Sequence, residues 1–175
     1  MKFPPRTLGR ALAVQSLYGA AFSGNRPLSV LDNLAAMGGV DLFHYRFDDE
    51  EPEFTPPEIQ PDQRRAAVRY ARRLLENIEQ HLSSIDPLIE SHLIGWSRER
   101  VGRLEWAILQ TAICEMLFLK TVDPPIAIDQ AITLAKWLAQ EDAARFINGV
   151  LDAVAKSSGV VQSKKRGHDD ELPFQ

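Results

Sequence analysis

Basic side chains concentrate at the start of the chain, where their spacing favours binding of an anion. The first 31 residues contain no aspartate or glutamate, whereas Lys2, Arg6 and Arg10 are positively charged. Arg6 and Arg10 are one helical turn apart and would lie on neighbouring faces of a helix. Such cations pair with phosphates, and the Tyr18 ring could stack on an exposed base. This segment is therefore a candidate RNA-binding surface, although Tyr18 could equally be a core residue with its hydroxyl at the surface.

A second candidate surface surrounds an Asn-Gly dipeptide near the other end of the chain. On a wheel of 100° per residue, Asp142, Arg145 and Gly149 share one side, and Phe146 lies at its boundary with the apolar side. A carboxylate can accept from a base, a guanidinium can pair with phosphate, and glycine leaves backbone open to close approach. Asn148 can hydrogen-bond across that gap. The alternative is that Phe146 is a core residue and Gly149 serves helix–helix packing.

Other chemistry has no support in the sequence. The four histidines are not at metal-ligand spacing from one another or from Cys114, the single cysteine, which we expect in the core. Glycine-rich phosphate loops and nucleophile elbows are absent, so we expect no catalytic residues, no metal and no cofactor. No stretch is an uninterrupted apolar span of membrane length, which favours a cytoplasmic protein. The formal net charge of −4 averages over a basic start and seven acids between residues 41 and 58.

Helices must position these residues, and the spacing of apolar side chains predicts them along most of the chain. A first helix is expected from about Thr7 to Phe22 and a second from Leu28 to about Met37. A third begins at Pro61 and has a basic polar side, which is either a solvated face or a nucleic-acid face. Its arginines are Arg64, Arg65, Arg69, Arg72 and Arg73.

Further helices are expected in the second half of the chain. Asp86 as N-cap and Pro87 at the first position predict the start of a fourth helix. Residues 101–119 are apolar on nearly all sides and predict a buried central helix, in which Glu115 needs hydrogen-bond donors. Asp129 is expected to cap the helix after it. In the last helix, helical spacing continues on both sides of the Asn-Gly pair, so we expect helix there rather than the hairpin that this dipeptide favours.

The pattern indicates an all-α fold of two helical bundles with no convincing strand. We expect one helical domain over residues 1–158, with an N-terminal bundle over about 1–83 and a C-terminal bundle over about 84–158. An acidic, proline-rich insert covers about 38–60, and its length makes it unusual for a loop within a compact domain. Residues 159–175 are expected to be a disordered tail.

Three motifs together resemble the NusB family of transcription antitermination factors. They are "RTLGRALAVQSLY" at the N-terminus, "RLEWAILQTAICEM" in the central helix, and "IAIDQAITLAKWLAQEDAARFINGVLDAVAK" near the end. The resemblance covers most of residues 6–37 and 84–156, and the closing block is the most specific. It implies a NusB-like fold of two roughly perpendicular helical bundles, with about seven helices in all.

The resemblance also implies partners and site residues. The family binds the boxA element of nascent ribosomal-RNA leader transcripts together with NusE, a small-subunit ribosomal protein, and joins RNA polymerase with other Nus factors. Asp142 and Phe146 match positions that the family uses for RNA. Glu105 matches a position implicated in NusE contact, and we expect Tyr18 to contribute to RNA and NusE binding. Some members form homodimers.

This chain also departs from the family pattern. Thr7 replaces an arginine of the family head, and Gln110 replaces an arginine of the central helix, which suggests lower positive charge and greater reliance on NusE. One alternative is therefore a helical protein-interaction module, or a homodimer, with weak or lost RNA binding. Another is an RNA-binding module like that of some ribosomal-RNA cytosine methyltransferases, although nothing here could form their larger catalytic domain.

Overall fold

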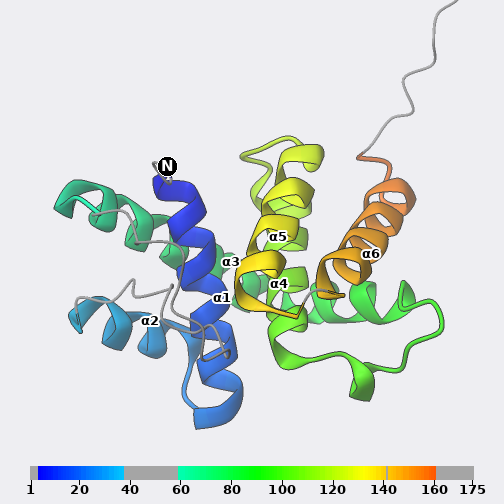
Figure 1. Cartoon of the computed structure of the whole chain (residues 1–175), viewed down its shortest axis with the longest axis horizontal. Coiled ribbons are helices and arrows are strands. Elements are labelled where there is room, and N and C mark those ends of the chain that lie inside the picture. Colours follow the sequence, from blue (N-terminus) through cyan, green and yellow to red (C-terminus); the bar gives the residue numbers. More distant parts are fainter. Residues whose placement is uncertain (1–3, 38–58, 141, 161–175) are drawn as a thin grey trace, which may run out of the picture.

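The computed structural model describes residues 4–37, 59–140 and 142–160 (Figure 1). Lys2, nearly all of the acidic insert and the expected disordered tail from residue 161 lie outside these ranges. The described part is entirely helical, as predicted, with six α-helices, one 3-10 turn and one π-helical segment. In chain order they are α1 (Pro5–Ser23), α2 (Pro27–Ala36), α3 (Pro61–Ser91), η1 (Arg98–Arg100), α4 (Arg103–Ile113), η2 (Cys114–Leu119), α5 (Pro124–Leu138) and α6 (Ala143–Ser157).

The helices form two groups that share one core. α1 packs against α2 and α3, while α4, α5 and α6 pack against one another, and α1 and α3 both contact α4 (Figure 1). Leucines from both groups, among them Leu12, Leu74, Leu109 and Leu151, are fully buried in a single apolar cluster. None of the helices in the described ranges is long and apolar enough to cross a membrane.

A glycine allows the closest helix contact in the N-terminal group. A Cβ atom added to Gly9 on α1 would lie 2.8 Å from the carbonyl oxygen of Ala67 and 3.0 Å from the Cβ atom of Tyr70, both on α3. Any larger residue would therefore push the two helices apart. Since α1 also contacts α4, this crossing sets how the N-terminal group is placed against the C-terminal group.

The predicted helix start at Asp86 is wrong. α3 continues without a break from Pro61 to Ser91, with Pro87 in its interior, and passes through the expected boundary at residues 83 and 84. A proline inside a helix costs about 3 kcal/mol. Burial of Ile85 and Ile89, both fully buried, contributes roughly 1.5–3 kcal/mol each and offsets that cost. The Asp86–Pro87 signal is the same in a helix start and in a continuous helix, and packing decides between them.

Asp129 also does not cap a helix. α5 begins earlier, at the Pro124–Pro125 pair, with Asp123 in the N-cap position, so Asp129 lies within α5. The central helix has two parts, because the α-helical α4 gives way at Cys114 to the wider π-helical η2. The remaining helix predictions are confirmed within one or two residues for α1 and α2, and the last helix runs through Asn148 and Gly149.

Candidate nucleic-acid interface

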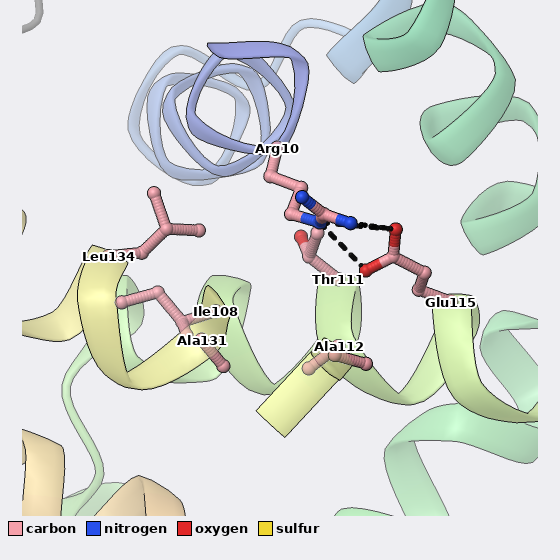
Figure 2. A pocket seen from close by; sticks show the side chains of 8 residues that line it. Arg10, Ile108, Thr111, Ala112, Glu115, Ala131 and Leu134 are labelled. Atoms are coloured by element: carbon pink, nitrogen blue, oxygen red, sulfur yellow. Dashed lines mark hydrogen bonds and ion pairs between the residues drawn. The ribbon is translucent and has the colours of Figure 1, made fainter. Parts of the chain in front are cut away.

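Arg10 is a buried structural residue and not a surface cation. Only 4% of it is exposed, and its guanidinium contacts Glu115, which is 0% exposed (Figure 2). Arg10 Nε donates to Glu115 Oε2 at 2.8 Å and Nη2 donates to Oε1 at 2.7 Å. The prediction that Arg10 contacts RNA phosphate is therefore wrong. The prediction that a buried Glu115 needs donors is confirmed.

Further polar groups complete the network around this ion pair. Arg10 Nη1 and the Thr7 hydroxyl both donate to Gln130 Oε1, at 3.1 and 2.8 Å, and the Tyr70 hydroxyl donates to Glu115 Oε1. Burial, together with the hydrogen bond to the Glu115 carboxylate, raises the pKa of Tyr70. The small pocket beside Arg10 and Glu115 leaves no space for a water molecule. The network joins α1, α3, η2 and α5, so its role is to lock the two helix groups together.

Arg6 remains exposed on the first turns of α1. Its guanidinium carbon lies 5.6 Å from the centre of the Tyr70 ring, a cation–π distance, while the residue as a whole is exposed to solvent. Lys2, expected beside it, lies outside the described residues. Among the described residues at the start of the chain, Arg6 is exposed and Arg10 is buried, so phosphate binding by Arg6 stays a prediction.

The polar side of α6 is exposed, as the helical wheel predicts. Arg145, Asn148 and Gly149 face solvent, and Asp142 is exposed just before the helix. Asp142 occupies the N-cap position, but its carboxylate makes no capping hydrogen bond, so it is free to accept from a ligand. In the described part of the chain Arg145 has no ion pair. As far as the described residues go, the face therefore presents a carboxylate that caps no helix, a cation without an ion pair, and open backbone.

Gly149 has no packing partner within the described residues. A Cβ atom added to it would have no atom within 4 Å beyond its own helix. A glycine in a helix interior costs about 1 kcal/mol relative to alanine, and here no contact within these residues requires it. Helix–helix packing inside this part of the chain, the alternative considered from the sequence, therefore does not explain Gly149. Open space over bare backbone is what close approach of another molecule needs.

Phe146 lies at the edge of this face and is half-buried. Its ring centre is 5.5 Å from that of Trp96, at an interplanar angle of 56°. Trp96 belongs to the segment between α3 and η1 and is 51% exposed. Sequence reasoning missed Trp96. The available signal was a large aromatic residue in a glycine-containing stretch between helices, where no helical face requires it.

A groove separates the second half of α1 from the start of α4. It has a volume of about 760 Å³, and Leu17, Arg103 and Trp106 are among its lining residues. Tyr18 is 36% exposed and packs edge-to-face on Phe22, with ring centres 4.8 Å apart. Because more than a third of Tyr18 is exposed, a partner can reach it.

Glu105 belongs to α4, the helix that contributes Arg103 and Trp106 to the groove, although Glu105 itself is not among the lining residues. It is partly buried in the first turn of α4, next to Arg103, whose guanidinium is 4.5 Å from the Phe22 ring centre. Tyr18 and Glu105, the two residues expected to contact NusE, thus belong to the two helices that border one groove.

The predicted site residues fall on three separate surfaces. Arg6 lies at the first end of α1, Tyr18 three helical turns further on, and the Asp142–Gly149 face on α6. Figure 1 shows α4 and α5 between α1 and α6, and the packing of α4 and α5 against α6 agrees with that view. A ligand that touches all three must extend across the molecule, as a single-stranded polymer can.

The two departures from the family pattern, Thr7 and Gln110, are mostly buried side chains. Gln110 Nε2 donates to Asp86 Oδ1 at 2.7 Å. The indole Nε1 of Trp106 donates to the same Asp86 oxygen at 3.1 Å. Both side chains are thus held by internal hydrogen bonds, and Gln110 also lines the groove between α1 and α4, so their effect on RNA affinity stays a prediction.

Several arginines of α3 are held by neighbouring carboxylates. Arg65 pairs with Asp62 and Arg72 pairs with Asp32 of α2. Arg69 and Arg73 are exposed. The ion pairs fit the interpretation of a solvated, charge-balanced face better than that of a nucleic-acid face.

Comparison with known proteins identifies the fold and the family. The family model described as "NusB family" matches residues 9–156, which include nearly all of the six α-helices. The chain belongs to the NusB family. A transcription antitermination protein NusB from Nitratidesulfovibrio vulgaris (strain Miyazaki F) is 31% identical over 156 residues, 89% of this chain and 90% of that protein.

Other relatives of the NusB family match in part or in structure. A NusB from a Nitratiruptor species is 46% identical over 87 residues, so the match spans 50% of this chain and 62% of that protein. A solved structure of antitermination factors NusB and NusE in complex with double-stranded RNA is similar at a TM-score of 0.66 and 26% identity. That match covers 87% of this chain and 97% of the solved chain.

Proposed function

We propose that the protein is a transcription antitermination factor that binds boxA RNA of nascent ribosomal-RNA leader transcripts together with NusE, and joins RNA polymerase with other Nus factors. The observation that carries this proposal is the similarity, over nearly the whole fold, to a NusB that was solved with NusE and RNA. The proposed role is one of binding and assembly in the cytoplasm, with no catalytic step and no cofactor.

In this proposal, different exposed surfaces bind RNA and NusE. Arg6 and Arg145 supply charge for phosphates, while Asp142 and Asn148 supply an acceptor and an amide for base edges. Gly149 lets a nucleotide approach the α6 backbone. The α1–α4 groove receives NusE, with Tyr18 and Glu105 on the two helices that border it, and its separation from the α6 face allows RNA and NusE to bind at the same time.

The test is a titration of labelled boxA RNA, and of a scrambled RNA of equal length, with and without NusE. We expect tighter binding of boxA than of the scrambled RNA, and a larger difference when NusE is present. Equal affinity for the two RNAs in the presence of NusE would contradict the proposal. Recovery of NusE without any RNA would favour the protein-interaction alternative.

Salt dependence identifies which arginines contact phosphate. Each phosphate contact to single-stranded RNA contributes about 0.7 to the slope of log affinity against log salt. Arg6→Ala and Arg145→Ala should each lower that slope by about this amount. Arg73→Ala is the matched control, because Arg73 is equally exposed but lies on α3. If Arg73→Ala lowers the slope and the other two variants do not, the RNA site is on α3 instead.

A further inference from the structure

The aromatic pair of Trp96 and Phe146 leaves the Trp96 ring half exposed at the edge of α6. Trp96 keeps 51% of its surface exposed although its ring contacts Phe146. The neighbouring Ile94, in the same segment between α3 and η1, is 85% exposed. Exposed apolar surface of this kind commonly marks a binding site. Because Phe146 lies at the boundary of the α6 face, Trp96 extends that face by one aromatic ring.

The two segments that supply the pair also carry exposed cations, which fit a nucleic acid better than an apolar partner. Arg145 precedes Phe146 in α6, and Arg100 of η1 is four residues beyond Trp96; both are exposed. Within the described ranges neither arginine has an ion pair, in contrast to Arg98, which pairs with Glu90 at 2.6 Å. Exposed cations in the same segments as aromatic rings favour single-stranded RNA, which proteins hold with phosphates on cations and bases on rings.

We propose that Trp96 is an RNA-stacking residue, and that its indole and the Phe146 ring hold an unpaired base of the RNA bound along α6. The indole offers a broad face for stacking, while the Phe146 ring fixes its position from one side. An isolated half-exposed tryptophan would change rotamer and lose entropy on binding, whereas one that already rests on Phe146 is partly pre-organised. This inference rests on the proposed RNA-binding function and adds the residue that recognises unpaired bases.

The first test compares Trp96→Ala with Trp96→Phe in the full chain. Loss of one base–aromatic stack lowers affinity by roughly 5- to 150-fold. We therefore expect Trp96→Ala to weaken binding of single-stranded boxA RNA within that range and Trp96→Phe to retain most of it. The salt slope should not change in either variant, since stacking releases no counterions. Binding of the same RNA annealed to its complement should be unaffected, because paired bases are not free to stack.

Controls distinguish the loss of base stacking from misfolding of the variant and from failure of the proposed RNA-binding function. Ile126→Ser removes an apolar side chain that is 49% exposed, close to the 51% of Trp96, but lies on α5 outside the proposed site, and it should bind RNA as the wild type does. Thermal unfolding of both Trp96 variants should show that they are folded at the temperature of the titration, so that weaker binding by Trp96→Ala reflects the lost ring contact. If the wild type binds no RNA, the proposed function fails. If it binds and Trp96→Ala binds equally well, only the stacking inference fails.

Intrinsic fluorescence gives an independent measure. The chain has three tryptophans, of which Trp106 is only 9% exposed and Trp96 is 51% exposed. Stacking of a base on Trp96 should quench the wild-type emission, and Trp96→Phe should remove that quenching while it retains binding. Unchanged quenching in Trp96→Phe would overturn the proposal. So would a variant Trp96→Ala that converts a dimer to a monomer at unchanged RNA affinity, because Trp96 would then belong to a protein interface.

Discussion

The buried Arg10–Glu115 pair makes a quantitative prediction about how the two helix groups are held together. The side chains of Arg10 and Glu115 are only 5% and 1% exposed, so neither charge can be solvated by water if the other is removed. Removal of one partner of a buried pair costs about 3–5 kcal/mol. We therefore expect Arg10→Met and Glu115→Gln each to lower the free energy of unfolding by about 3 kcal/mol or more. That is a large part of the roughly 5–15 kcal/mol that stabilises a typical domain.

A matched pair on the surface supplies the control. Arg26 also makes a two-oxygen contact with a glutamate, Glu79, at 2.7 and 2.9 Å, but their side chains are 68% and 47% exposed. An exposed pair contributes about 0–1 kcal/mol, so Arg26→Met should cost no more than that. The two substitutions are chemically the same, and burial of the pair is the difference between them.

The measurement is equilibrium unfolding in urea, followed by circular dichroism. The double variant Arg10→Met with Glu115→Gln should cost less than the sum of the single variants, with a coupling of about 1–3 kcal/mol, because no unpaired charge remains buried. If Arg10→Met costs no more than Arg26→Met, the buried network does not lock the helix groups together. If Arg10→Met remains folded and its slope of log RNA affinity against log salt falls by the value of one phosphate contact, Arg10 is an RNA ligand after all.

Two further predictions concern single residues. Gly149→Ala should raise the free energy of unfolding by about 0.5–1 kcal/mol, whereas Gly9→Ala should lower it by about 1–3 kcal/mol, because only Gly9 has an atom of α3 within 3 Å of the added Cβ. Thermal unfolding would show whether the two signs differ, and lower RNA affinity of the stabilised Gly149→Ala would support close approach of RNA. Burial raises the pKa of the Cys114 thiol to about 12, from 9.0 for a free thiol, so the native protein should not react with iodoacetamide at pH 8. As pH rises, the thiol ionises in the unfolded protein before it ionises in the folded one, so the free energy of unfolding should fall between about pH 9 and 12. Rapid labelling of the native protein at pH 8 would contradict this prediction, as would a free energy of unfolding that stays constant from about pH 9 to 12.

Sequence periodicity predicts local structure well where one signal is present. The apolar spacing around Asn148 and Gly149 correctly favours helix over hairpin, because several buried side chains outweigh one turn dipeptide. Asp86 and Pro87 form a typical helix-start pattern, but no helix starts there, because burial of Ile85 and Ile89 favours the continuation of α3 through both residues. Local capping energies are about 1 kcal/mol, and burial of two isoleucines exceeds that.

The candidate site was predictable in part. The wheel correctly separates the exposed Arg145 and Gly149 from the buried side of α6, since that depends only on helix geometry. Arg10 was misplaced because an arginine near Arg6 has the same local sequence whether it faces RNA or a carboxylate 105 residues away. The requirement that Glu115 find a donor was already visible in the sequence. Its pairing with Arg10 was not, because tertiary contacts of this length leave no local pattern.

The most direct test of the central claim is the affinity for labelled boxA RNA, in the presence of NusE, of the wild type and of the double variant Arg6→Ala with Arg145→Ala. Both arginines are exposed, so the variant should unfold at the wild-type midpoint. We predict that the wild type prefers boxA over the scrambled RNA and that the double variant binds boxA more weakly, with a salt slope lower by about 1.4, twice the value for one phosphate contact. Equal binding of boxA and scrambled RNA by the wild type, or an unchanged slope in the variant, would contradict the account.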